Sequence, residues 1–204
     1  MLDRMEMPLR IDWLLPLVAL AIAGVSRGES PPLEPTPLAV LRGLSREELA
    51  ANPPVRVRAV VTRSRRSSLF IQDDSAGMYV NVARARLRGV MPTDVPIVEV
   101  PLGSEVEIVG VADPGGFSPI ILPATIQILG PAEIPRPQPA DPAGFFSGAD
   151  DSQFVECEGI VEEAIEQGDH WRLAARYLFQ PFVIAVHKSA IEVDPESLID
   201  AVIR

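Results

Sequence analysis

Cysteine, histidine and aromatic residues are scarce in this sequence, and the scarcity excludes several classes of protein. Cys157 is the only cysteine among 204 residues, so an internal disulfide and a cysteine-based metal cluster are both excluded. The two histidines, His170 and His187, are too few for a histidine-based zinc site. The fold must therefore be held together by packing.

Aromatic residues make up only 5% of the chain, whereas prolines number 21 and the hydrophobic fraction is an ordinary 47%. A hydrophobic fraction of this size supports a packed core. Frequent prolines divide the chain into short elements separated by turns, which favours an all-β barrel or sandwich over a helical bundle. Cys157 alternates with charged residues, and we expect a small buried strand residue rather than a nucleophile.

Residues 1–26 have the pattern of a signal peptide. The apolar run from Trp13 to Val25 follows two arginines, is too short to span a bilayer comfortably, and contains the small residues Ala21 and Ala23 at a cleavage point. A retained N-terminal membrane anchor is the alternative. In both cases we expect the rest of the chain outside the cytoplasm, periplasmic or secreted, after a proline-rich linker over residues 27–37.

Residues 38–130 show the strand count and order of a five-stranded β-barrel of the oligonucleotide/oligosaccharide-binding (OB) type. The capping-box spacing from Ser45 to Glu48 predicts one short helix before the barrel. Three alternating segments predict a meander, an irregular connection over 83–101 follows, and two more strands close the barrel. The expected strands cover residues 55–62, 68–73, 78–82, 105–111 and 119–129. Candidate core residues are Val57, Val80 and one of the adjacent pair Ile108 and Val109.

A proline-rich linker over residues 131–149 leads to residues 150–204, which repeat the beginning of the first unit. Alternating segments at 153–161, 170–175 and 182–186 predict the first three strands of a second, incomplete OB-like unit. Such a unit lacks its closing strands and exposes strand edges. Either the chain is a fragment of a longer gene product, or the tail over 197–204 completes the sheet by pairing with the first unit or with another chain.

Strand cores and turns in both units resemble a known family. The segments that carry the resemblance are residues 44–62, 69–73, 77–80, 103–110, 113–119 and 151–159. Together they resemble the tandem OB-fold-like region in the extracytoplasmic part of bacterial membrane sensor histidine kinases, over roughly the whole chain after the linker. The resemblance implies a sensor domain of a two-component system and carries over no catalytic residues. This sequence contains no transmitter or kinase portion.

The sequence offers no nucleophile, base and orienting acid in a recognisable arrangement. His170 and His187, at opposite ends of the second unit, are expected to be exposed, and Asp73 and Asp74 are explained by a hairpin turn. Three aromatic residues of the second unit could stack on a sugar ring, but are expected in its core: Trp171, Tyr177 and Phe179. We therefore expect no enzyme activity, no catalytic residue, no metal and no cofactor.

Arginines gather in the first unit, between residues 54 and 90. They are Arg56, Arg58, Arg63, Arg65, Arg66, Arg84, Arg86 and Arg88, and they outnumber the two aspartates of the same stretch. Together with Phe70 and Tyr79 on neighbouring strands, they resemble the basic, aromatic face of a nucleic-acid-binding OB fold. The candidate ligand-binding residues are Arg56, Arg58, Arg63, Phe70 and Tyr79.

The charge of the whole chain argues against a nucleic-acid partner. The formal net charge is −10, which repels a phosphate backbone. We favour the interpretation that the arginines complement the acidic second unit or an acidic partner. The predicted function is a non-enzymatic extracytoplasmic binding or sensing module that engages a small ligand or a protein partner, and that meets a membrane only through an uncleaved N-terminal segment. The alternatives are a protein that binds single-stranded nucleic acid through the arginine-rich face, and a truncated gene fragment without independent function.

Overall fold

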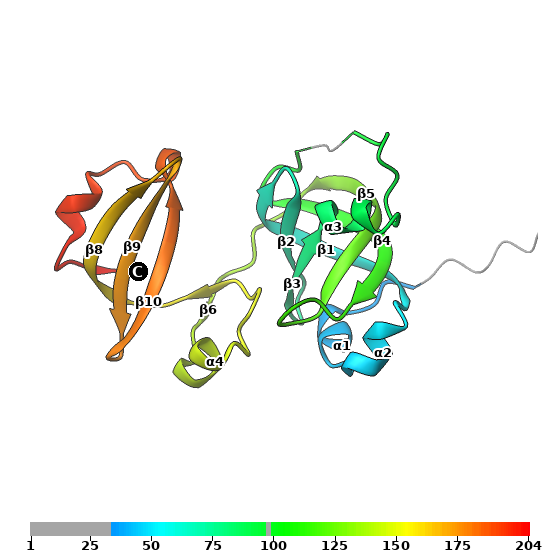
Figure 1. The fold of residues 1–204 in the computed structure, drawn as a ribbon, viewed down its shortest axis with the longest axis horizontal. Coiled ribbons are helices and arrows are strands. Elements are labelled where there is room, and N and C mark those ends of the chain that lie inside the picture. Colours follow the sequence, from blue (N-terminus) through cyan, green and yellow to red (C-terminus); the bar gives the residue numbers. More distant parts are fainter. Residues whose placement is uncertain (1–33, 97–98) are drawn as a thin grey trace, which may run out of the picture. The chain divides into compact units, whose positions relative to one another are not determined.

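The computed structural model describes residues 34–96 and 99–204 and is built mainly from strands (Figure 1). The all-β class predicted from the proline and turn pattern is therefore confirmed. The expected signal peptide over 1–26 and most of the linker that follows it lie outside the described residues. None of the helices in the described part of the chain is long and apolar enough to cross a membrane.

Five strands close into a barrel in the order β1-β2-β3-β5-β4 (Figure 1). Their bounds are β1 (Pro54–Arg65), β2 (Ser68–Gln72), β3 (Gly77–Asn81), β4 (Ser104–Asp113) and β5 (Ile120–Pro131). Neighbouring strands are antiparallel except β3 and β5, which are parallel. A closed five-stranded barrel of this kind is the OB architecture, so the predicted OB-like barrel is confirmed.

The barrel core follows the period-two alternation of the strands. Val57 and Val80 are completely buried, as expected. In β4 the adjacent pair divides as strand geometry requires: Ile108 is completely buried, whereas Val109 points outward and is 36% exposed.

Two short helices, α1 (Leu38–Arg42) and α2 (Arg46–Ala50), lie at one end of the barrel in Figure 1. Their leucines at 38, 41 and 49 are buried in the main core cluster, so these helices cover that end of the apolar interior. The predicted capping box is present: the Ser45 hydroxyl accepts from the backbone N–H of Glu48, and the Glu48 carboxylate accepts from that of Ser45.

The connection between β3 and β4 was expected to be irregular over residues 83–101. It begins instead with a third helix, α3 (Val82–Leu87). Asn81 caps it by accepting from the backbone N–H of Arg84 at 2.8 Å. Only two of its side chains, Val82 and Ala85, are buried. A single helical turn with two core residues has too little apolar periodicity to be recognised in the sequence.

The expected linker over 131–149 contains ordered elements, β6 (Gln138–Pro139) and α4 (Pro142–Ser147). The chain just after α4 is hydrogen-bonded to the barrel. Arg42 donates to the carbonyl oxygens of Gly77, Ala149 and Asp151 at 2.8–3.2 Å. The side-chain amide of Gln153 pairs with the backbone N–H and carbonyl of Gly77, as a neighbouring strand residue would.

Glycine at position 77 makes this attachment possible. A Cβ there would lie 2.2 Å from the carbonyl oxygen of Ser152, which is far inside van der Waals contact. The backbone of the segment can therefore lie directly against β3 only because Gly77 has no side chain.

The second unit is a four-stranded sheet in the order β10-β9-β8-β11. Its strands are β8 (Gly159–Gln167), β9 (His170–Tyr177), β10 (Gln180–His187) and β11 (Val202–Ile203), and two 3₁₀ turns, η1 (Lys188–Ala190) and η2 (Pro195–Leu198), connect the last two. All neighbouring pairs are antiparallel, and β10 lies at one edge of the sheet. The sheet does not close, which agrees with an incomplete second OB-like unit.

Three details of this unit differ from the predictions or from one of the alternatives that the sequence left open. The segment 153–161 is divided between β7 (Val155–Glu156), which pairs with β6, and the start of β8. Cys157 lies between these two strands and is half-buried. The tail does not pair with the first unit, because Val202 lies opposite Ile160 of β8, within the second unit itself.

Candidate ligand-binding groove

A β-bulge in β1 decides which way Arg63, the central cation of the candidate site, points. Val57 and Val61 face the barrel interior, and strict alternation would turn Arg63 inward with them. The register of β1 against β2 shifts between Val61 and Arg63, so that Arg63 rather than Thr62 lies opposite Phe70. The extra residue turns Arg63 to the outer surface of the barrel, which is the effect expected of a bulge.

Three predicted site residues meet on this outer surface. Arg63 lies opposite Phe70 in β2, and Phe70 lies opposite Tyr79 in β3. The two rings are tilted with centroids 5.0 Å apart, and the Arg63 guanidinium carbon lies 5.9 Å from the Phe70 centroid. These distances are those of an aromatic pair and of a cation–π contact.

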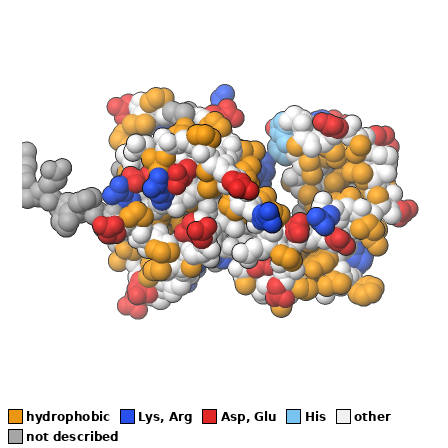
Figure 2. Space-filling model, turned by 180° about the vertical axis from the view of Figure 1, so that it is seen from behind, with side chains coloured by type: hydrophobic (Ala, Val, Ile, Leu, Met, Phe, Trp, Pro, Cys, Tyr) orange, Lys and Arg blue, Asp and Glu red, His pale blue; other side chains and the backbone are white. Residues whose placement is uncertain are grey.

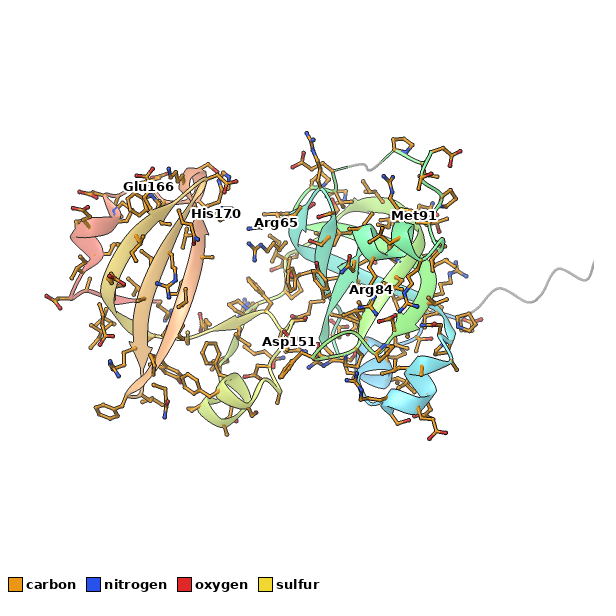
Figure 3. The ribbon with its side chains drawn as sticks, viewed as in Figure 1. Arg65, Arg84, Met91, Asp151, Glu166 and His170 are labelled. Carbon is orange, nitrogen blue, oxygen red and sulfur yellow. The ribbon has the colours of Figure 1, made fainter. Side chains whose placement is uncertain are left out.

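The row from Arg63 to Tyr79 lines an open groove of about 480 Å³. Its other walls come from the end of β3 and α3, the β4–β5 loop, and the segment after α4 that is attached to the barrel. The residues that add polar or aromatic groups to these walls are Asn81, Arg84, Phe117, Ser118, Asp151 and Ser152, two of which, Arg84 and Asp151, are labelled in Figure 3. We call this site the polar groove.

The cations of the polar groove are held in different ways. Arg84 forms an ion pair of 3.1 Å with Asp113, whose side chain is 2% exposed, and this buried carboxylate orients the guanidinium. Partial burial, together with the charge of Arg65, lowers the pKa of Arg63 from its usual value. A partly desolvated guanidinium gains more from a bound anion than a fully hydrated one.

The β4–β5 loop forms a wall of the groove through a tight turn. Gly115 has a φ of +61°, and a Cβ there would lie 2.1 Å from the carbonyl oxygen of Ser118. The Asp113 carboxylate also accepts from the backbone N–H of Gly115 at 2.8 Å. This turn presents Phe117, which is 71% exposed, to the groove.

The other two predicted site residues lie outside the groove. Arg56 and Arg58 do face outward from β1, but each forms an ion pair with a glutamate of β4, Glu107 at 2.9 Å and Glu105 at 2.8 Å. Contrary to the prediction, they therefore do not join Arg63 in the groove, although all three face outward from β1. Acidic and basic side chains also lie side by side on the barrel face seen in Figure 2.

Sequence reasoning missed Asp151 and Phe117 as groove residues. Asp151 is distant in sequence from the barrel strands, and it reaches the groove through the contacts that Arg42 and Gln153 make. Its carboxylate accepts a hydrogen bond from the Ser118 hydroxyl. No local pattern predicts a contact of this kind, whereas the glycines just before Phe117 are a signal from which a turn could have been predicted.

The histidines are not at opposite ends of the second unit, and this expectation is wrong. His170 begins β9 and His187 ends β10, so they form a cross-strand pair with ring centroids 5.1 Å apart. Figure 2 shows them together in pale blue. Asp169 pairs with His170, which lowers the pKa of the exposed Asp169 carboxyl. Among the described residues, no group of three or more His, Cys, Asp or Glu is placed to hold a metal.

Asp73 and Cys157 are the remaining candidates for chemistry. The Asp73 carboxylate accepts from the backbone N–H groups of Ser75 and Ala76, as a turn residue does, and from that of Leu38 at the start of α1. Burial raises the pKa of the Cys157 thiol, which disfavours the reactive thiolate.

The aromatic residues of the second unit do not all belong to its core. Trp171 and Tyr177 are half-buried, and Tyr177 contacts the rings of Phe145 and Phe146 in α4. Phe179, in contrast, is 87% exposed at the β9–β10 turn, so its expected place in the core is wrong.

Comparison with known proteins gives no family. No family model matches the chain, and no curated protein matches it. Among solved structures, the chain is similar to one described as "Crystal structure of the tetrameric p202 HIN2", at 11% identity and a TM-score of 0.29, over 66% of this chain and 69% of that one. A likeness at this TM-score establishes neither a shared ligand nor a shared role.

Proposed function

We propose that this protein is a non-enzymatic binding module that holds a small anionic ligand carrying a flat or sugar ring in the polar groove. The observation that carries the proposal is the row of Arg63, Phe70 and Tyr79, which the β1 bulge brings onto one outer surface. The rings offer a stacking surface and the guanidinium an anion contact. Strands 2 and 3 and the neighbouring loops are also the part of an OB fold that binds oligonucleotides and oligosaccharides.

The charges around the groove favour a small ligand over a polynucleotide. Three arginines of the cluster, Arg56, Arg58 and Arg84, form ion pairs with acidic residues of the barrel. The Asp151 carboxylate stands at one wall of the groove. Tight binding of a nucleic-acid strand needs several phosphate contacts in succession, and these acidic groups oppose them.

The biological setting that we propose is extracytoplasmic sensing. It rests on the signal-peptide pattern of residues 1–26 and on the resemblance to the input region of sensor histidine kinases. In this role, occupancy of the groove would be passed on to a partner protein. A protein partner that itself binds in the groove is an alternative occupant.

A ligand panel with matched variants tests the proposal. Nucleoside monophosphates, sugar phosphates and sulfated disaccharides are titrated into the full chain by calorimetry. We expect Arg63→Gln and Tyr79→Ala each to weaken the best ligand by roughly 10- to 100-fold, the range for a charge-assisted hydrogen bond or one stacked ring. The control is Arg58→Gln, which removes an outward arginine of the same strand that lies outside the groove. Equal weakening by Arg58→Gln and Arg63→Gln would refute the proposal, as would a panel without a binder.

Single-stranded nucleic acid is the second candidate, favoured by the Phe70–Tyr79 pair beside an arginine. Filter binding of an oligothymidylate at two salt concentrations decides between the candidates. A steep loss of affinity with salt, corresponding to several released counterions, would favour the nucleic-acid function. Absence of binding at low salt would exclude it.

A further inference from the structure

The barrel contains a second hollow, of about 430 Å³, whose lining is mainly apolar. It lies among β2, β5 and the chain that follows α3, and Figure 3 labels one of its residues, Met91. We call it the apolar pocket and define it by six of its lining residues: Arg66, Leu69, Val82, Met91, Ile126 and Ile128.

The apolar pocket lies where two hydrophobic clusters of the barrel meet. Leu69 belongs to the main core, Val82 and Met91 belong to a smaller cluster, and Ile126 packs against both. The first three side chains are at most 5% exposed, so they form a floor that is part of the folded core. Ile128 is 42% exposed and lies at the rim. A concave apolar site with a preformed floor and a volume of several hundred Å³ is typical of small-molecule binding.

Both charged residues among the described lining residues of the apolar pocket are arginines. Arg65 and Arg66, at the end of β1 and the turn into β2, are both exposed, and no acidic residue is found among the described lining residues. Arg65 also lines the polar groove, whereas Arg66 lines the apolar pocket alone. An apolar floor with a guanidinium at its edge matches a molecule that is apolar along its length and anionic at one end.

We propose that the apolar pocket binds a free alkyl carboxylate, with the hydrocarbon chain on the floor and the carboxylate at Arg66. The floor excludes a ligand that is polar throughout, and the arginine favours an anionic head over a neutral or cationic one. Apart from Arg65, this site and the polar groove share no lining residue.

A chain-length series measures the apolar part of the proposal. Alkanoates from hexanoate to dodecanoate, below their micelle concentrations, are titrated into the full chain by calorimetry. We expect affinity to rise about fourfold for each added methylene until the chain fills the pocket, and then to level off. Decyltrimethylammonium should bind at least about tenfold more weakly than decanoate, because its head is repelled by the guanidinium.

Variants at the rim test the placement without disturbing the core. Ile128→Trp fills the mouth and should weaken decanoate at least about tenfold, whereas Ile160→Trp, at an exposed isoleucine of β8, should leave it unchanged. Arg66→Glu should weaken decanoate by a similar factor and leave decanol within about twofold. Unfolding curves of each variant establish that it is folded.

Three results would overturn the proposal: no binding by any alkanoate, equal affinity for decanoate and decyltrimethylammonium, or no effect of Ile128→Trp. Loss of decanoate binding in Tyr79→Ala would place the ligand in the polar groove and would also refute it. Binding to decanoate-containing phosphatidylcholine vesicles but not to free decanoate would identify a lipid surface as the partner instead. The proposed function stays testable in each case, because its ligands and its arginine variants are different.

Discussion

Replacing the two residues at the tip of the β9–β10 hairpin should stabilise the second unit. Leu178 and Phe179 have φ values of +46° and +69°, in the left-handed region that bulky L-residues rarely adopt. A two-residue hairpin turn in this conformation favours Asn-Gly. The perturbation is therefore the double substitution Leu178→Asn with Phe179→Gly.

The gain can be worked from the backbone and the exposure of these residues. Each bulky residue in the left-handed region costs about 1–2 kcal/mol, most of which Asn and Gly avoid. Little apolar burial is lost, since Leu178 and Phe179 are 59% and 87% exposed. The hydrogen bond from Arg176 goes to the carbonyl oxygen of Phe179, a backbone atom that remains. Allowing about 0.5–1 kcal/mol for the added freedom of glycine in the unfolded chain, the net gain is about 1–2 kcal/mol.

Urea unfolding followed by tryptophan fluorescence measures this change. Trp171 lies in β9 and reports on the second unit, whereas Trp13 lies in the expected signal peptide. The control is Gly168→Ala in the β8–β9 turn, where φ is +62° and alanine should destabilise by about 1 kcal/mol. If the double variant is no more stable than the wild type, the exposed side chains of the tip make contacts that the reasoning omits, and the strain argument fails.

Three further predictions concern the barrel. Ile108→Ala should cost about 2–5 kcal/mol in urea unfolding, whereas Val109→Ala should cost under about 1 kcal/mol, and similar costs would contradict the observed facing of β4. Gly77→Ala should speed proteolysis of the segment after α4, because its Cβ would lie 2.2 Å from a carbonyl oxygen there, while Gly116→Ala, with open space around it, should not. Hydrogen bonds from Ser45, the helix N-cap, lower the pKa of Glu48 in the folded protein. The stability that Glu48 contributes is therefore present above the pKa of the unfolded chain and is lost as pH falls through the lowered pKa. Between about pH 5 and about pH 3, the melting temperature should decline less in Glu48→Gln than in the wild type, and equal declines would contradict this.

Local chemistry accounts for the features that could be predicted from the sequence. Alternation of apolar and polar residues is a property of one strand, and it predicted the barrel strands and the burial of Val57 and Val80. The capping box from Ser45 to Glu48 and the turn at Asp73 depend on hydrogen bonds within a few residues, and both are present. The α3 helix was not predicted, because a single turn between strands has almost no period of its own.

Only part of the candidate site could be predicted, because strand register decides which side chains face the groove. Phe70 and Tyr79 were expected on neighbouring strands, and their ring contact agrees with this. Arg56 and Arg58 were grouped with Arg63, but they pair with glutamates of β4 and lie outside the groove. Arg63 faces outward only because of the bulge, whose position depends on how β1 pairs with β2.

The sequence by itself determined the all-β class, the OB-like order of the first unit and its turns, because strand periodicity and turn chemistry act over a few residues. The tertiary structure alone decided which arginines are neutralised by β4, that Asp151 forms a wall of the polar groove, and that His170 and His187 lie side by side. These outcomes depend on contacts between residues far apart in the chain. Such contacts are fixed by strand register and by packing around the closed barrel, which no local pattern specifies.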